Sequence, residues 1–346
     1  MEAALSRLVV AGGFGVFGAA AVARLRAAGE RPLAASRRDG ADLRLDVEDP
    51  ASLRATLRRG DVVVDAVGPF QHRTTALVAA AADLGFDVVD ISDSLDHVRA
   101  VRALRERIDA AGIRVLCACS TLSAVSAAMI RLSGLAAPVG FTCVLAPATR
   151  YTARPGTAGS LVASVGAPVD VLRDGQLVRR IAWREARTFT LPAPVGAVRA
   201  RLLGGGPDAL LLPEVWPSLR HTSFYVHSNV PGLDALLAAA ARWPRLLRRI
   251  GTPAPALALA RLLGARRGWV LYEVEDAGGR LVRCLLTGEG RSYDAAVVPA
   301  VLAARALAAG TFSARGLVPP DRHVAPDVLL AALRDAGLAR VALPSD

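Results

Sequence analysis

Hydrophobic residues in the first third of the chain gather in short continuous runs, and the stretches between these runs carry apolar residues at helical spacing. Continuous apolar strands joined by helical crossovers are typical of a parallel sheet that is covered on both faces. We therefore predict an α/β fold built on a doubly wound parallel sheet with strand order 3-2-1-4-5-6. The predicted strands cover residues 9–11, 32–35, 43–47, 61–66, 86–91 and 114–119.

From about residue 138 the pattern changes to strand-like runs separated by turn signals such as Arg173-Asp174-Gly175. This texture predicts an α+β domain with one mainly antiparallel sheet, followed by helices that pack back on the first domain. We expect a first domain at 1–135, an inserted domain at 136–290 and returning C-terminal helices at 291–346. The strands expected in the inserted domain are 141–145, 178–183, 197–203, 223–227 and a hairpin of 269–274 with 281–287.

The segment 9–20 has the order of a buried strand, a glycine-rich turn and the start of a helix. Gly13, Gly15 and Gly18 form the pattern G-x-G-x-x-G. In this pattern the first glycine allows a tight turn, the second lets a pyrophosphate approach the backbone, and the third lets the helix pack closely. The turn also directs backbone N–H groups and the helix dipole at an anion. The sequence thus predicts a Rossmann dinucleotide site, with a purely structural turn as the alternative.

The end of the second predicted strand indicates which dinucleotide is bound. NAD sites usually place an acidic residue there to hold the ribose 2′-hydroxyl, whereas this chain has Ser36, Arg37 and Arg38. A guanidinium group suits a 2′-phosphate, so we predict NADP rather than NAD; the alternative is that the two arginines are solvated loop residues. Asp46, after the third strand, is expected to border the adenine.

The turn after the fourth predicted strand is expected on the nicotinamide side of the cofactor. Gly68 would let the backbone approach the ligand, Pro69 would fix the turn, and Phe70 follows directly. Ligands of such sheets bind beyond the carboxyl ends of the strands, where this turn lies. These three residues therefore join the predicted cofactor site.

The 346 residues are enough for two domains, and 53% hydrophobic with 21% charged residues indicates a globular chain. The net charge is +11, and every basic residue is an arginine. Because the chain has no lysine, Schiff-base chemistry is excluded. The arginines are spread along the chain without interleaved aromatic residues. We therefore attribute the charge to a codon bias together with a phosphate-bearing small molecule as the partner, and we expect no nucleic acid.

The four cysteines do not have the spacing of a zinc ribbon. We expect buried free thiols, with Cys117 and Cys119 on one face of a strand, and no metal site. The apolar start of the chain runs straight into the glycine turn, and no apolar run reaches the length of a membrane span. The sequence predicts a cytoplasmic protein.

The residues that would carry the reaction are less evident than those of the cofactor site. Hydride transfer to a C=O or C=N bond needs a proton donor within hydrogen-bond reach. The candidates are Tyr151, Tyr225 and His227, each with a structural role as the alternative. Tyr225 and His227 would point to the same face of one strand.

The segment 243–269 combines arginines with leucines and alanines and is divided by Pro253 and Pro255. One interpretation is a peripheral contact with a membrane or a lipid substrate. The other is a pair of short amphipathic helices that cover the sheet. The sequence leaves both open.

The segments 12–18, 65–71 and 88–93 together resemble the saccharopine dehydrogenase-like NADP-binding family, and 290–294 resembles the return segment of that family. The resemblance implies a Rossmann domain built from both chain ends and an inserted domain for substrate binding, often with dimer formation. We accordingly expect a homodimer. The resemblance also implies that Gly13, Phe14, Gly15 and Val16 contact the pyrophosphate. It implies that Gly68, Pro69 and Phe70 contact the nicotinamide side of the cofactor.

The function implied by this resemblance is an NADP-dependent oxidoreductase that acts on a C=O, C=N or C=C bond of an unidentified small molecule. The missing lysine argues against saccharopine itself, because true amino-acid dehydrogenases of the family use basic side chains at the reaction centre. Two alternatives stay open. One is a non-catalytic NADP-binding sensor or scaffold, and the other is a membrane-associated reductase of lipid or polyketide intermediates.

Overall fold

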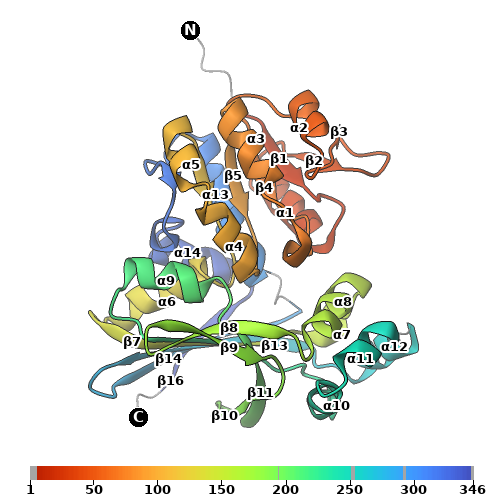
Figure 1. The fold of residues 1–346 in the computed structure, drawn as a ribbon, viewed down its shortest axis with the longest axis vertical. Helices are drawn as coiled ribbons and strands as arrows, with labels where there is room; N and C mark the ends of the chain where they lie inside the picture. The colour runs from red at the N-terminus through yellow and green to blue at the C-terminus, as the bar shows by residue number, and fades with distance from the viewer. Residues whose placement is uncertain (1–5, 194, 251–253, 291–293, 344–346) are drawn as a thin grey trace. The chain divides into compact units, whose positions relative to one another are not determined.

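A computed structural model describes residues 6–193, 195–250, 254–290 and 294–343, which form two compact units (Figure 1). The first unit comprises Met1–Ala128, Leu210–Val215 and Tyr293–Ala332. The second comprises Met129–Ala209, Trp216–Ser292 and Leu333–Asp346. Both units are therefore assembled from segments that are distant in the sequence.

Within the described residues, the first unit holds a seven-stranded parallel sheet with the order β15-β6-β5-β4-β1-β2-β3. The predicted order 3-2-1-4-5-6 is confirmed, and β15 extends the sheet beside β6. The α/β class predicted from the apolar runs is confirmed as well. The strands are β1 (Leu8–Ala11), β2 (Leu33–Ser36), β3 (Leu43–Arg44), β4 (Val62–Asp65), β5 (Asp87–Asp90), β6 (Arg114–Leu116) and β15 (Gly316–Leu317).

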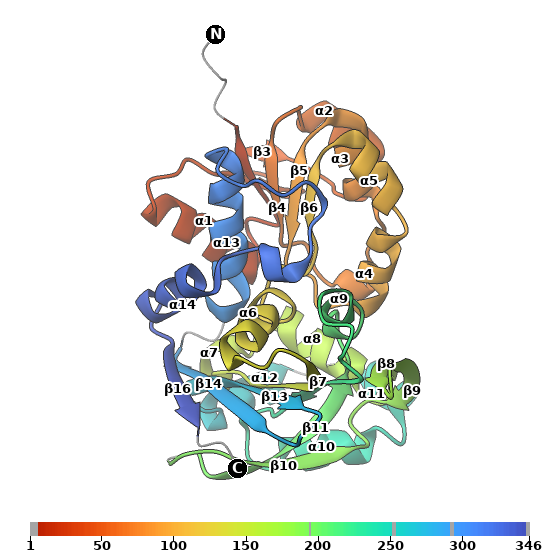
Figure 2. The ribbon, with the colours of Figure 1, turned by 90° about the vertical axis from the view of Figure 1, so that its left-hand side faces the viewer.

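Helices cover both faces of this sheet (Figure 2). One face packs against α2 (Pro50–Thr56), α3 (Ala76–Leu84), α4 (Leu95–Arg102) and α5 (Arg105–Ala111). The other face packs against α1 (Val16–Ala27) and α13 (Asp294–Ala308). Strands β1, β4 and β5 are buried throughout, which fits the valines at their centres.

Local signals in the sequence account for several helix ends of the first unit. The Asp49 side chain accepts a hydrogen bond from the N–H of Ala51 at 2.9 Å, and Pro50 occupies the first helical position of α2. Arg24 of α1 donates to Asp294 at the start of α13, with an Nε–Oδ1 distance of 2.9 Å. This contact ties the first helix of the chain to a helix about 270 residues later.

The second unit holds a mixed sheet of nine strands among the described residues, with the path β10-β11-β12-β7-β13-β14-β16, with β8 paired to β12 and with β9 paired to β8. The expected antiparallel hairpin is present as β13 (Arg267–Asp276) and β14 (Leu281–Glu289). However, β7 (Pro138–Ala146) and β12 (His221–Val226) pair in parallel. The remaining strands are β8 (Pro168–Arg173), β9 (Gln176–Ile181), β10 (Ala186–Thr190), β11 (Ala197–Gly204) and β16 (Ala339–Leu343).

The end of the chain differs from the expectation that residues 291–346 return to the first domain as helices. Helix α13 lies in the first unit, but β16 pairs antiparallel with β14 in the second unit, with Val341 opposite Leu285. Strand β14 would otherwise be an edge strand with unpaired backbone groups, and β16 satisfies them. Helix α14 (Pro326–Asp335) precedes this strand.

The cysteine pair near β6 also differs from the prediction. Strand β6 ends at Leu116, and Ala118 adopts a positive φ of 55°. As a result, Cys117 packs in the core on one face of the sheet and Cys119 in the core on the other. All four cysteines are free and buried. None of the helices in the described part of the chain is long and apolar enough to cross a membrane.

Candidate functional site

The glycine turn joins β1 to α1 and is fixed by backbone hydrogen bonds. The N–H groups of Gly12 and Gly13 both donate to the carbonyl of Ala35, at 2.9 and 3.2 Å, and Gly15 donates to the carbonyl of Gly12 at 2.7 Å. The positive φ of 75° lies at Gly12, so Gly12 makes the tight turn that the motif led us to assign to Gly13. Gly12 is thus a site residue that the motif alone missed.

The other two glycines are needed because the backbone segments approach each other closely. A Cβ atom at Gly13 would lie 2.8 Å from the Cβ of Ala34 on β2. A Cβ atom at Gly18 would lie only 2.1 Å from the carbonyl oxygen of Gly12. A side chain at Gly13 would collide with β2, and one at Gly18 would push α1 away from the turn. The first turn of α1 is therefore held directly against the strand end, as the motif predicts.

The start of α1 has the features of an anion-binding site. Gly15 is the N-cap residue and gives no side-chain hydrogen bond, and the first turn contains no acidic residue. The positive end of the helix dipole is therefore not neutralised by the chain. Phe14 and Val16 flank the turn and are 43% and 40% exposed. The glycine turn and the start of α1 form an anion cradle that fits a pyrophosphate, which backbone groups would bind.

The end of β2 lies beside the glycine turn, because β1 and β2 are parallel neighbours. Ser36 closes the strand, and its Oγ accepts a hydrogen bond from the N–H of Arg38 at 3.2 Å. The side chains of Arg37 and Arg38 are exposed. A guanidinium nitrogen of Arg37 lies 3.7 Å from Oδ2 of Asp46. An exposed pair at this distance is weak, so Arg37 stays available to a stronger anion.

The turn after β4 is in contact with the glycine turn. A Cβ atom at Gly12 would lie 2.9 Å from the carbonyl oxygen of Ala66, which shows how closely the two segments approach. Gly68 has no atom within 4 Å of the position a Cβ would take. Pro69 precedes a short 3-10 helix, Phe70–His72, and Phe70 is buried with 5% exposure. The predicted cofactor residues of the first unit therefore gather at the carboxyl ends of the parallel strands.

An ion-pair network that the sequence did not reveal holds this second turn in place. Arg73, whose side chain is 6% exposed, donates from both terminal nitrogens to Asp65, at 3.2 and 3.0 Å, and also to the carbonyl of Val67 at 2.6 Å. Its Nε donates to Glu48, and its guanidinium lies 5.6 Å from the ring centroid of Phe70. Burial raises the pKa of Asp65, and Arg73 counteracts that rise. Arg73 is a positioning residue for the turn.

A second polar pair lies next to the same turn. Gln71 Nε2 donates to Oδ1 of Asp93 at 3.2 Å, and Asp93 follows β5. Because β4 and β5 are parallel neighbours, both residues lie beyond the carboxyl ends of adjacent strands. The exposed carboxylate of Asp93 is therefore a polar group at the edge where ligands of such sheets bind.

The candidate proton donors lie in the second unit, where Tyr151 and His227 follow the carboxyl ends of the parallel strands β7 and β12, and Tyr225 belongs to β12 itself. Tyr151 belongs to α7 (Thr149–Thr152), which follows β7, and it is 42% exposed. Thr149 Oγ1 donates to the carbonyl of Ser228 at 2.5 Å, and Asn229 Nδ2 donates to the carbonyl of Pro147 at 2.9 Å. These bonds hold the two strand-end segments together. The parallel pairing thus brings the segments of Tyr151 and His227 side by side.

His227 and Tyr225 are more constrained than Tyr151. His227 Nδ1 lies 3.1 Å from both the N–H nitrogen and Oδ1 of Asn229, and its Nε2 lies 3.3 Å from Oδ2 of Asp234. Its ring stacks on Trp269 with a centroid distance of 6.4 Å. Tyr225 is 8% exposed and belongs to the same apolar cluster as Trp269. Burial raises the pKa of its hydroxyl.

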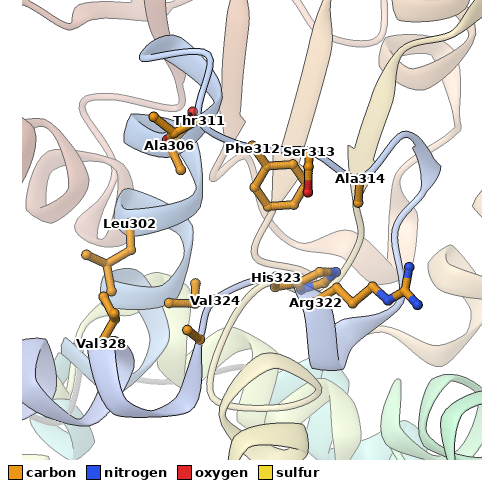
Figure 3. A pocket seen from close by; sticks show the side chains of 11 residues that line it. Leu302, Ala306, Thr311, Phe312, Ser313, Ala314, Arg322, His323, Val324 and Val328 are labelled. Carbon is orange, nitrogen blue, oxygen red and sulfur yellow. Dashed lines mark hydrogen bonds between the residues drawn. The ribbon is translucent and has the colours of Figure 1, made fainter.

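Two hollows open in the first unit. One, of about 410 Å³, is lined by Gly13 and Phe14 of the glycine turn together with residues of α1 and β2. The larger, of about 580 Å³, is lined by the end of α13, residues 311–314 and residues 322–328 (Figure 3). None of the predicted cofactor residues lines the larger hollow. Among the described residues, no group of three or more His, Cys, Asp or Glu side chains could hold a metal ion.

Comparisons with known proteins agree with this geometry. Residues 13–116 match the family model described as saccharopine dehydrogenase NADP binding domain. A solved structure of apo saccharopine dehydrogenase (L-Glu forming) from Saccharomyces cerevisiae matches with a TM-score of 0.57 at 16% identity, covering 98% of this chain and 100% of that chain. A mutant of meso-dapdh from Clostridium tetani matches with a TM-score of 0.46 at 12% identity, covering 94% and 98%. The search of curated proteins gave no significant match.

The family match covers the glycine turn, the arginines that end β2 and the Gly68 turn. The structural likeness to saccharopine dehydrogenase extends over nearly the whole chain and shows a shared fold. The resemblance predicted from the sequence segments is thereby confirmed. The N-terminal part of this chain, residues 13–116, belongs to the saccharopine dehydrogenase NADP-binding domain family.

Proposed function

We propose that this protein is an NADP-preferring oxidoreductase that transfers hydride to or from a C=O, C=N or C=C bond of a small molecule. The observation that carries the proposal is the open anion cradle at α1 with Arg37 and Arg38 beside it at the end of β2. The cradle suits a pyrophosphate, and the two guanidinium groups suit a 2′-phosphate. The bound cofactor would supply the hydride, and the chain would position it.

Two further features support hydride chemistry, one in each unit. The turn at Gly68 leaves space for a ligand, and Arg73 holds that turn in place through hydrogen bonds to Asp65 and to the carbonyl of Val67. In the second unit, Tyr151 offers a hydroxyl that is 42% exposed, so it is the strongest of the three proton-donor candidates. The four buried free thiols support a reducing, cytoplasmic location.

The test is to follow NADPH and NADH consumption with a panel of ketones, imines and enoyl esters. We expect turnover with NADPH and little with NADH. Binding of NADPH without turnover on any member of the panel would favour the second candidate function, a non-catalytic NADP-binding sensor. The constrained surroundings of His227 and Tyr225 favour that second candidate, because they leave fewer groups for proton transfer. Equal affinity for NADH and NADPH would contradict the NADP preference.

A further inference from the structure

Large hydrophobic side chains are exposed mainly in one part of the second unit. Among the described residues, eleven large hydrophobic side chains are exposed, and six of them lie between residues 236 and 263. Trp243 is 63% exposed, whereas Trp183 and Trp269 are buried. A cluster of this kind marks an interaction surface, because single exposed apolar residues are normally scattered. The six are Leu236, Trp243, Leu246, Leu259, Leu262 and Leu263.

These side chains come from three consecutive helices, α10 (Leu233–Ala240), α11 (Pro244–Ile250) and α12 (Ala254–Leu263), together with Trp243 between the first two. We call them the α10–α12 surface. In Figure 1 the three helices lie next to α7 and α8 (Pro155–Ser164) of the same unit. Helix α12 packs against α7, and α11 packs against α8. The surface is thus built on elements that the second unit holds in place.

The exposure of α12 follows from how its inner side is held. Arg261 Nε donates to the carbonyl of Ala153 at 2.8 Å, and Arg150 donates to the carbonyl of Leu262 at 2.8 Å. Arg150 is thereby used in the second unit's own structure. Leu259, Leu262 and Leu263 are spaced i, i+3 and i+4, so they share one helical face. That face is directed away from the contacts that hold the helix.

The same segment has an unusual charge pattern. Residues 235–272 contain seven arginines and no acidic residue. Arg242, Arg245 and Arg249 are exposed, and within the described part of the chain none of the three forms an ion pair. Arginines elsewhere in the molecule commonly face a carboxylate, as Arg7 faces Asp61. The cationic charge of the α10–α12 surface is therefore not neutralised by the chain.

We propose that the α10–α12 surface docks on an anionic lipid membrane. Exposed leucines with a tryptophan can enter the headgroup boundary while the arginines contact acidic headgroups. Tryptophan is typical of that boundary. A second copy of this chain is a poorer occupant, because two such surfaces would bring six exposed arginines together, three from each copy. The proposal concerns where the protein works and is independent of its cofactor preference.

The experiment is flotation of the full chain with vesicles of phosphatidylcholine alone and with vesicles of equal phosphatidylcholine and phosphatidylserine. We expect binding to the anionic vesicles and little binding to the neutral ones. The variant Arg242→Gln/Arg245→Gln/Arg249→Gln should lower the partition coefficient by roughly a hundredfold, because each arginine near such a surface contributes about a factor of five. Leu262→Ser should also weaken the binding at unchanged charge.

The matched control removes three exposed arginines from the first unit, as Arg54→Gln/Arg58→Gln/Arg59→Gln. This control should keep nearly the full binding. An equal loss in the control variant would mean that only the net charge matters, and it would overturn the proposal. Absence of binding to anionic vesicles would overturn it as well. The proposal would also be overturned if the intact protein is a dimer that Leu262→Ser dissociates and the intact protein does not bind vesicles.

Discussion

The glycine turn of the first unit and the strand ends of the second unit differ in what they would use for chemistry. The first offers backbone groups, since the start of α1 follows a turn with glycines where a Cβ would collide, and the turn at Gly68 leaves open space. The second offers side chains, Tyr151, Tyr225 and His227, which are gathered by a parallel pair of strands. A site made of backbone groups depends on the close packing of the chain segments that carry them. A site made of side chains depends on whether neighbouring residues already engage the polar group that would react. The predictions below test that contrast.

The largest effect is expected from the support of the backbone site. Arg73→Ala leaves the buried Asp65 without its ion-pair partner, which should lower the free energy of unfolding by about 3–5 kcal/mol. Chemical denaturation measures this loss. The double variant Arg73→Ala/Asp65→Ala should lose less than the single variant. Arg99→Ala, which breaks an exposed pair with Asp96, should cost less than about 1 kcal/mol. Equal losses for Arg73→Ala and Arg99→Ala would refute the positioning role of Arg73.

The next effect tests the close packing of the turn itself. Gly18→Ala would place a Cβ 2.1 Å from a backbone oxygen, so we expect a loss of about 3 kcal/mol in stability together with loss of dinucleotide binding. Gly156→Ala, in α8, meets nothing within 4 Å and should be neutral. Thermal unfolding and cofactor titration measure both. Normal binding by Gly18→Ala would mean that α1 is not held against the turn.

A smaller effect is expected on the pH dependence of stability, through a buried histidine of the first unit. His323 lines the larger hollow of the first unit, and burial lowers the pKa of its imidazole from its ordinary value of 6.5 to about 4. Between these values the unfolded chain binds more protons than the folded chain, so stability should fall as pH drops below about 6.5. From about pH 7 to pH 5 the expected loss is about 2 kcal/mol. His323→Gln should remove most of this slope in denaturation curves, and an unchanged slope would exclude His323 as its origin.

The parallel sheet and the predicted cofactor site could be predicted because the patterns that indicate them span only neighbouring residues. Apolar runs and the order of strand, turn and helix fix the parallel sheet, and Asp49-Pro50 fixes the start of α2. The positive φ at Gly12 could not be assigned, because Gly12 lies outside the G-x-G-x-x-G pattern and only the fold shows which of the two adjacent glycines makes the turn. Pairing of β7 with β12, and of β16 with β14, joins segments about 80 and 60 residues apart in the sequence. The local sequence pattern of a strand does not indicate which distant strand it pairs with.

The candidate site was predictable to the same degree. Glycines and strand-end arginines carry their chemistry in the sequence, whereas the role of Arg73 depends on burial beside Asp65, which only the fold creates. The fixed surroundings of His227 likewise come from Asn229, Asp234 and Trp269, of which only the last is distant in the sequence. Sequence reasoning therefore locates the cofactor better than the proton donor.

The most direct test of the central claim is calorimetric titration of NADPH and NADH into the wild type and into Arg37→Ala/Arg38→Ala. The account predicts that the wild type prefers NADPH and that the double variant loses tenfold or more of its NADPH affinity, about 1.4 kcal/mol, while its NADH affinity is unchanged. Arg54→Ala, an exposed arginine of α2, serves as the control and should bind like the wild type. Equal NADPH affinity in the wild type and the double variant would contradict the claim that the end of β2 recognises the 2′-phosphate.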